Sequence, residues 1–243
     1  MSVETNKTVR ELVLANPAAA RTLEQFGIDY CCSGNKSLVE ACANASVPVE
    51  QVVGALQKPQ PVPDVQDWQI EPLAQLTRYI VEKHHAFTRE EIKRLKPLLA
   101  KVVSVHGMNH PELTCVQSIF RELDQELTMH MMKEEEFLFP YIEKMEAAVN
   151  TKRSLPPCMF GTVQNPVRMM MMEHDSAGDA LREMKAITNS YAVPTDGCVS
   201  YQELYRALPA FEADLHEHIH LENNILFPRS IQMEEAAFSG GLA

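Results

Sequence analysis

Glycine and long apolar runs are scarce in this sequence. Only 9 of its 243 residues are Gly. The apolar residues recur mostly three and four positions apart, which is the spacing of one face of a helix, so we expect an all-α chain. No apolar run approaches the roughly 18 residues that a membrane-spanning helix needs, so we expect no membrane segment.

Basic residues are also few in comparison with acidic ones. Lys and Arg number 22 against 33 Asp and Glu, for a formal net charge of -11. This balance argues against a nucleic-acid partner, because phosphate contacts need a basic face. The first residues, MSVETNKTVREL, lack the apolar stretch of a secretory signal, so we expect a cytoplasmic protein. The six cysteines are scattered except for one adjacent pair, and they do not indicate a disulfide framework.

Alternating prolines divide the chain into two parts. Pro59, Pro61 and Pro63 lie in the segment KPQPVPD, which prefers extended polyproline geometry and acts as a semi-rigid spacer. We therefore expect a small helical domain over residues 1–57, a proline-rich linker over 58–67 and a larger domain over 68–243.

The larger domain is predicted to contain four long helices, over about 71–106, 112–148, 166–190 and 199–227. Their fairly short connections favour an up-down-up-down four-helix bundle. Because proline lacks a backbone donor, we expect Pro97 to bend the first helix and Pro140 to bend or break the second. We expect the fourth helix to end near Pro228.

The second and fourth of these helices carry an internal repeat. The segments HMMKEEEFLFP, residues 130–140, and HIHLENNILFP, residues 218–228, share a His, a Glu four residues later and Leu-Phe-Pro at the end. A candidate histidine lies on the helix before each segment, His84 for the first and His174 for the second. The pattern predicts that the bundle consists of two similar helical hairpins related by pseudo-two-fold symmetry.

Helical periodicity places six polar residues among the apolar residues that face the core. They are His84, His130, Glu134, His174, His218 and Glu222. Three other histidines are one or two positions off this face, which turns them by about 100° or 200° around the helix; they are His85, His216 and His220. The last two, His106 and His110, belong to a predicted loop. We therefore select the six as metal ligands and exclude these five histidines.

Each H-x-x-x-E segment could instead be a surface pair that adds a few tenths of a kcal/mol to its helix. Here, however, the pairs occupy positions where Leu or Phe belongs, and a buried carboxylate without a partner costs several kcal/mol. A metal centre would satisfy all six groups at once. Four imidazoles and two carboxylates without a thiolate fit two iron ions, or less often manganese. We expect the glutamates and a solvent-derived oxo group to bridge the irons, leaving an open position on each.

Two further features bear on this centre. A metal-bound imidazole commonly needs a carboxylate or carbonyl on its other nitrogen, and Glu126 or Glu173 could supply one. Cys31 and Cys32 are adjacent, and a bond between neighbouring cysteines is strained, so we do not expect a structural disulfide. We interpret them as a reactive or metal-relaying pair, with inert packing as the alternative.

These motifs resemble those of a known family. The histidine and H-x-x-x-E pattern, with His174-Asp175 and the Leu-Phe-Pro ends, resembles the hemerythrin-like di-iron fold. The stretch GIDYCCSGNKSLVEACA resembles the short di-cysteine domain that precedes this fold in bacterial iron–sulfur cluster repair (RIC) proteins. The resemblance extends from Thr8 to Pro228. It departs at Ser33-Gly34-Asn35-Lys36, where relatives often have Gly-Gly-Lys.

The resemblance implies a function. Members of the repair family hold a di-iron centre with four His and two Glu, and they protect cells under nitrosative and oxidative stress. It implies that this chain repairs damaged iron–sulfur clusters by supplying iron, with damaged iron–sulfur proteins as partners and Cys31 and Cys32 in iron transfer. The alternative is a cytoplasmic protein that binds or reduces nitric oxide at the open iron positions. No catalytic residue is predicted.

Overall fold

The computed structural model describes residues 5–31, 33–58 and 66–240. Within these ranges the regular elements are helices, and a single isolated bridge joins Thr8 and Ser37. The prediction of an all-α chain is thus confirmed. Contacts divide the chain into two compact units, one of residues up to Glu71 with Ile219–Pro228, the other of Pro72–His218 with residues from Arg229 on. Among the described helices, none has the length and apolar character needed to cross a membrane.

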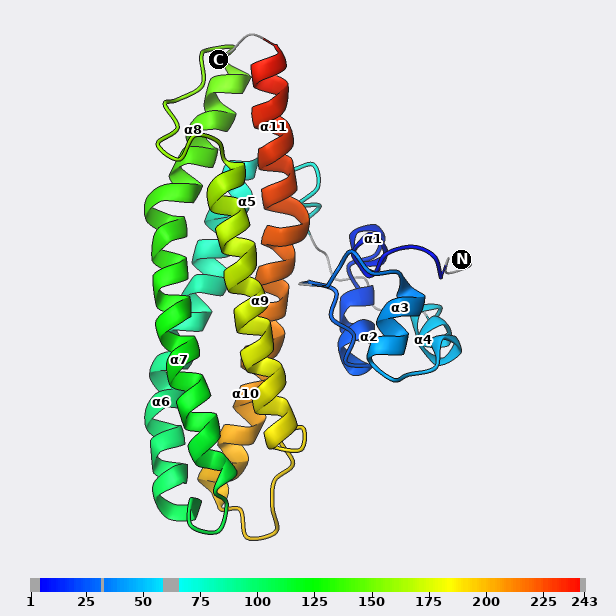
Figure 1. Cartoon of the computed structure of the whole chain (residues 1–243), viewed down its shortest axis with the longest axis vertical. Coiled ribbons are helices and arrows are strands. Elements are labelled where there is room, and N and C mark those ends of the chain that lie inside the picture. Colours follow the sequence, from blue (N-terminus) through cyan, green and yellow to red (C-terminus); the bar gives the residue numbers. More distant parts are fainter. Residues whose placement is uncertain (1–4, 32, 59–65, 241–243) are drawn as a thin grey trace. The chain divides into compact units, whose positions relative to one another are not determined.

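Four short helices form the N-terminal part of the chain (Figure 1). They are α1 (Val9–Ala15), α2 (Ala19–Gln25), α3 (Leu38–Asn44) and α4 (Val49–Leu56). Helices of this length are marginal alone, so their stability depends on packing. Each places a fully buried side chain in a shared apolar core, namely Val9, Leu23, Leu38 and Val52. Gly27 follows α2 with φ of 66°, the left-handed conformation that suits glycine after a helix.

Helices α1 and α3 start next to each other with the same capping arrangement. Thr8 and Ser37 each accept a hydrogen bond from the backbone N–H of a glutamate three residues on, and that glutamate accepts one in return. Such a capping box satisfies N–H groups that have no partner in the first helical turn. The backbone N–H of Leu38 donates to the carbonyl of Lys7 at 2.9 Å, which links the two starts.

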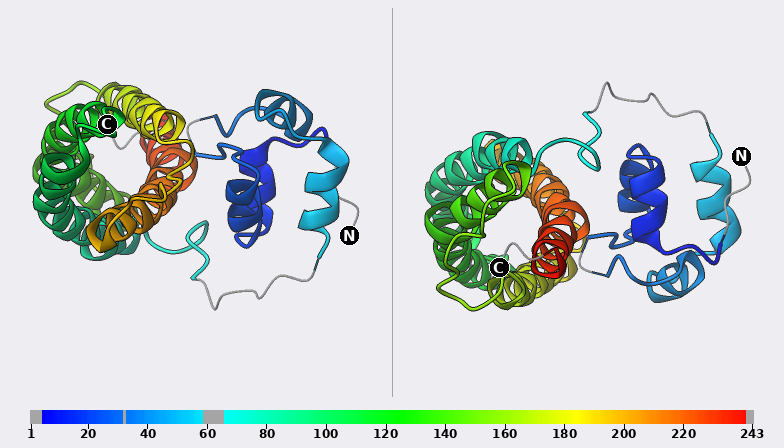
Figure 2. Two further views of the ribbon diagram at one scale, coloured as in Figure 1. Left: turned by 90° about the horizontal axis from the view of Figure 1, so that it is seen from below. Right: turned by 90° about the horizontal axis from the view of Figure 1, so that it is seen from above.

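Beyond Trp68 the described chain forms four long helical rods (Figure 1). The first consists of α5 (Leu73–Tyr79), a π-helical segment η1 (Ile80–His85) and α6 (Ala86–His106); the second of α7 (Glu112–Lys133), η2 (Glu134–Leu138) and α8 (Phe139–Asn150); the third of α9 (Gln164–Ile187); the fourth of α10 (Val199–Leu221), η3 (Glu222–Leu226) and α11 (Phe227–Ser239). Helix α7 packs against α6 and α9, and α5 packs against α8. Seen from its end, the bundle has its rods around a common axis (Figure 2).

The prediction that the fourth helix ends near Pro228 is wrong. Pro228 is the second residue of α11, which continues to Ser239, and Pro140 holds the same position in α8. Each proline directly follows a π-helical turn, so it lies where an α-helix begins again. In a first turn the missing N–H has no intrahelical partner, and proline is tolerated there.

A buried carboxylate supports the start of the first rod. Pro72 precedes α5 and makes no side-chain cap, but Glu146 on α8 accepts hydrogen bonds from the backbone N–H groups of Leu73, at 2.7 Å, and Ala74, at 2.9 Å. Only 7% of Glu146 is exposed. A carboxylate at this place satisfies free N–H groups and complements the positive end of the helix dipole. This contact holds α5 against α8.

Candidate metal centre

Two groups of buried ligand atoms meet inside the bundle. The first consists of His85, Glu134, His218 and Glu222, and the second of His130, Glu134, His174 and Glu222. Within each group the ligand atoms all lie within 4.8 Å of one another. The two groups share Glu134 and Glu222, so they form one site with two adjacent positions. These residues are at most 3% exposed.

The imidazoles face one another through their Nε2 atoms. Nε2 of His130 lies 3.0 Å from Nε2 of His174, and Nε2 of His85 lies 3.2 Å from Nε2 of His218. Two nitrogen ligands held about 2.1 Å from one ion at a right angle would be about 3.0 Å apart. The spacing of each pair therefore fits two ligands of a single metal ion.

Glu134 lies between the two pairs. Its Oε2 atom is 3.3 Å from Nε2 of His130 and 3.4 Å from Nε2 of His85. A fully buried carboxylate and four buried imidazoles would destabilise a core that offered them no counter-charge. Cations at the two positions would supply that charge. The donor set, nitrogen and oxygen without thiolate, suits divalent iron or manganese.

The structure places His85 in the site and leaves His84 outside both groups. Regular α-helical periodicity predicts His84 at this place, because it lies four residues after Ile80. Residues Ile80–His85 form a π-helical turn, however, in which hydrogen bonds join residues five apart. His85, five residues after Ile80, therefore returns to the core-facing side. Nothing in the apolar spacing of the sequence signals this extra residue.

His84 is nonetheless completely buried, next to the site. Its Nδ1 atom lies 3.1 Å from Oδ1 of Asp214, and its ring stacks on that of His218 with centroids 5.8 Å apart. In the part of the chain that the structure describes, its Nε2 atom has no hydrogen-bond partner. His84 thus packs against the face of the His218 ring.

Carboxylates orient one imidazole of each group from outside. Nδ1 of His130 lies 2.9 Å from Oε2 of Glu173, which also pairs with Lys133. Burial opposes the charge of Glu173, but its bonds to His130 and Lys133 lower its pKa to about 2. Of the two glutamates considered from sequence, Glu173 therefore takes this place, whereas Glu126 accepts a hydrogen bond from Ser176.

The second orienting carboxylate was not found by sequence reasoning. Nδ1 of His85 lies 2.6 Å from Oε1 of Glu135, and Nη2 of Arg89 lies 2.7 Å from the same oxygen. Glu135 follows Glu134 in the run EEE, so its sequence position alone does not distinguish it from a solvated glutamate. The arrangement matches the rule that a ligand histidine is held through its other nitrogen.

The cysteine pair is only partly visible. Cys31 is buried, and its backbone N–H donates to Oδ1 of Asp29 at 3.0 Å, while its Sγ lies 3.3 Å from the same oxygen. Cys32 lies outside the described residues, as does most of the predicted linker. The role of the pair in redox or iron transfer stays a prediction.

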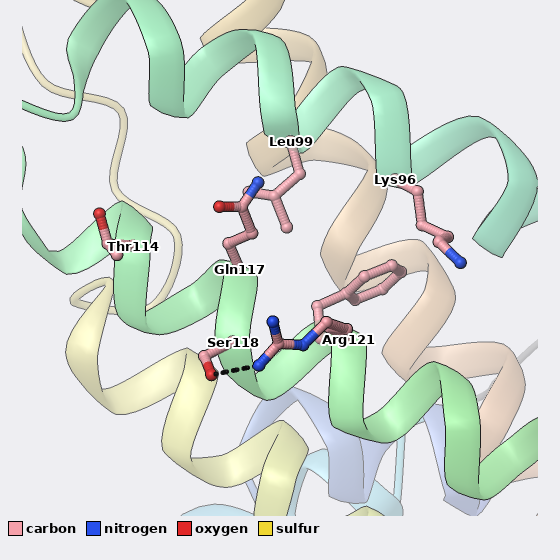
Figure 3. Close-up of a pocket in the computed structure, with 7 residues that line it drawn as sticks. Lys96, Leu99, Thr114, Gln117, Ser118 and Arg121 are labelled. Carbon is pink, nitrogen blue, oxygen red and sulfur yellow. Dashed lines mark hydrogen bonds between the residues drawn. The ribbon is translucent and has the colours of Figure 1, made fainter.

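A separate cavity of about 420 Å³ lies between α6 and α7 (Figure 3). Leu99 and Phe120 are apolar residues of its lining, and Lys96 and Arg121 are basic ones. Lys96 pairs with Asp124, and Arg121 donates to the hydroxyl of Ser118. None of the residues that line it belongs to the two metal groups, so this cavity is not the metal centre.

Comparison with known proteins adds two family matches. Residues 76–230 match the hemerythrin HHE cation binding domain, and residues 5–60 match a domain of unknown function named ScdA_N. The chain is also 33% identical over 233 residues to the iron-sulfur cluster repair protein YtfE of Yersinia pseudotuberculosis (serotype IB), covering 94% of this chain and 98% of that protein. The protein of the same name from Yersinia pestis (strain Pestoides F) matches with the same identity and coverage.

Proposed function

Because the chain belongs to the hemerythrin-like family of YtfE iron–sulfur cluster repair proteins, we propose that it holds two iron ions and supplies iron to damaged iron–sulfur clusters. The observation that carries this proposal is the pair of buried His₂Glu₂ groups that share Glu134 and Glu222. The damaged iron–sulfur proteins are the proposed partners, and the cytoplasm is the proposed place of action.

The proposed ligands divide evenly between the two positions. His85 and His218 would hold one ion and His130 and His174 the other, with Glu134 and Glu222 as shared carboxylates and solvent completing the coordination. In this assignment His85 replaces His84. When bound, a pair of iron ions supplies positive charge, redox capacity and coordination positions open to small molecules.

The protein groups around the site are suited to a centre that stores iron and can release it. The glutamate charges at the proposed ligand positions offset those of the cations, and protons compete with the metal for the neutral imidazoles. Glu135 and Glu173 keep Nε2 of His85 and of His130 directed at the ligand positions. Cys31 and Cys32 are proposed to assist transfer, because thiols are soft iron ligands and the clusters themselves are bound by thiolates.

The donor function can be tested with a [4Fe-4S] enzyme damaged by nitric oxide. Iron-loaded protein is mixed with the damaged enzyme, and the activity of that enzyme is followed. We expect recovery with the wild-type protein and none with His130→Ala, which removes a proposed ligand. If free ferrous iron restores activity but the iron-loaded protein does not, the chain is not an iron donor.

A nitric-oxide site is the second candidate function. Each group offers four protein residues, fewer than the six ligands of an octahedral ion, which leaves positions for a small molecule. Nitric oxide is titrated into the anaerobic, iron-loaded protein while optical and EPR spectra and headspace gas are followed. Spectral changes without nitrous oxide would support binding alone, and formation of nitrous oxide would support reduction. Unchanged spectra would exclude both.

A further inference from the structure

The cavity between α6 and α7 lies apart from the proposed metal centre (Figure 3). Phe120, on its α7 side, precedes His130 by ten residues, which is about 15 Å by the rise of the helix. Its volume of about 420 Å³ falls within the range of sites that hold small molecules, and such sites commonly lie between the helices of a bundle. The chemistry of its lining residues therefore decides which kind of molecule it can hold.

One face of α7 supplies most of the polar lining. The residues on this face recur at intervals of three and four, which places them on one side of the helix; they are Thr114, Gln117, Ser118 and Arg121. In the part of the chain that the structure describes, the side chains of Thr114 and Gln117 make no hydrogen bond. The Gln117 side chain points toward α6 (Figure 3). Its amide is therefore open to a molecule bound between the two helices.

Arg121 supplies a positive charge with which no carboxylate pairs within the described ranges of the chain. Its guanidinium donates to the Ser118 hydroxyl at 3.4 Å, as the dashed line in Figure 3 shows, and that hydroxyl donates to Glu122, also at 3.4 Å. Hydrogen bonds of this length are weak, so a better acceptor can replace Ser118 as the partner of Arg121. The planar fork of arginine matches a carboxylate, with which it forms two parallel hydrogen bonds.

The other charges at the cavity do not oppose an anion. Lys96, on the α6 side, is the second basic residue of the lining, and it pairs with Asp124. Among the described residues that line the cavity, none is acidic. The charge of the lining is therefore complementary to a negatively charged group, although the chain as a whole carries a formal charge of -11.

The rest of the lining is apolar. Leu99 of α6 and Phe120 of α7 are 1% and 2% exposed, so they belong to the core of the bundle as well as to the cavity. The methylene stems of Lys96 and Arg121 add further apolar surface. Removing such surface from water is favourable, so a molecule with an apolar body gains affinity here.

We propose that the cavity between α6 and α7 binds a small amphipathic carboxylate of the type of a medium-chain fatty acid. The carboxylate bonds to the guanidinium of Arg121 and to the amide of Gln117, and the apolar chain packs against Leu99 and Phe120. Inorganic phosphate carries the charge without an apolar body, so it should bind more weakly than such a carboxylate.

Calorimetric titration of the full-length, iron-loaded protein with octanoate tests the proposal. We expect one saturable site per chain with a dissociation constant of about 1 mM or below. Octanamide has the same chain without the charge and should bind at least about tenfold more weakly, because it forms no charge-assisted bonds with arginine. The optical spectrum of the iron centre should stay unchanged, since the cavity is distant from it.

Three results of this titration would overturn the proposal. The first is a lack of saturation up to about 10 mM octanoate, which is weaker than a built site of this size should give. The second is a change in the iron spectrum that follows the binding curve, because the carboxylate would then bind at the metal centre. The third is binding of inorganic phosphate as tight as that of octanoate.

Variants locate the bound molecule. Arg121→Gln should weaken octanoate binding by at least about tenfold, because the charged donor is lost. Arg78→Gln, which removes an exposed charge on α5, should change it by less than about twofold. Gln117→Trp places a large side chain in the cavity and should weaken binding as much as Arg121→Gln does. Circular dichroism reports whether each variant is folded, and unchanged affinity in a folded Arg121→Gln or Gln117→Trp protein would refute this site.

Discussion

Oε2 of Glu173 lies 2.9 Å from Nδ1 of His130, while Nε2 of the same ring lies 3.0 Å from Nε2 of His174. The carboxylate thus holds the ring nitrogen that points away from the site. Glu135 stands in the same relation to His85 on the other side of the site. One ring in each of the two groups is therefore oriented by a carboxylate, which in turn pairs with a cation, Lys133 or Arg89.

The first prediction concerns Glu173→Gln, which keeps the shape of the side chain and removes its charge. We expect the affinity for metal to fall by about 10- to 100-fold, because the ligand imidazole loses its orienting carboxylate. Competition with a chelator under low oxygen measures this affinity. Glu126→Gln is the matched control, since Glu126 bonds to Ser176 rather than to a ligand ring. If both variants lost metal affinity equally, the cause would be the removal of a negative charge near the site and not the loss of the contact between Glu173 and His130.

The second prediction compares two neighbouring histidines, both fully buried. His85→Ala should lose half or more of the bound iron, because the group with His218 loses a ligand. His84→Ala should keep most of it, because His84 contacts Asp214 and lies outside both groups. Metal analysis of protein purified under low oxygen gives the ratio of iron to chain. If His84→Ala instead lost more iron than His85→Ala, the ligand would be His84, as regular helical periodicity predicts.

The third prediction concerns the stability of the bundle. Glu146→Gln should lower the free energy of unfolding by about 1–3 kcal/mol, because two buried N–H groups at the start of α5 lose a charged acceptor. Urea denaturation at pH 7 measures the difference from wild type. Glu90→Gln, on the exposed side of α6, should change it by less than about 0.5 kcal/mol.

The fourth prediction is a pH dependence at the far end of the bundle. The hydrogen bond with Asp196 raises the pKa of His110, against an opposing effect of burial, and the same bond lowers the pKa of Asp196. The contribution of His110 to stability is full below its unfolded pKa of about 6.5 and is lost as pH rises through the folded value. That of Asp196 is present above about 3.9 and is lost as pH falls.

The pair should therefore stabilise the fold most between about pH 4 and pH 6.5. The urea midpoint of His110→Asn should fall further below that of wild type at pH 5.5 than at pH 9. The effect will be modest, because half of the Asp196 side chain is exposed to solvent. A difference between the two proteins that is the same at both pH values would refute the role of this pair.

Several features were predictable from sequence because they depend on local spacing. The three-and-four periodicity predicted helices, and the match between residues 130–140 and 218–228 predicted equivalent segments on the second and fourth rods. Both segments do become π-helical at the glutamate and resume α-helix at Phe-Pro. The family resemblance stated from these motifs is confirmed by the comparisons. The domain boundaries and the role of Cys31 and Cys32 stay predictions.

The sequence by itself determined the all-α fold, the family and the residue types of the proposed centre, because these follow from periodicity and from motifs within single helices. The tertiary structure decided which neighbour faces inward: one extra residue in the π-turn Ile80–His85 brings His85, not His84, to the site. It also selected Glu173 over Glu126 as the partner of His130. Such contacts depend on how helices pack side by side, and no spacing along one helix specifies them.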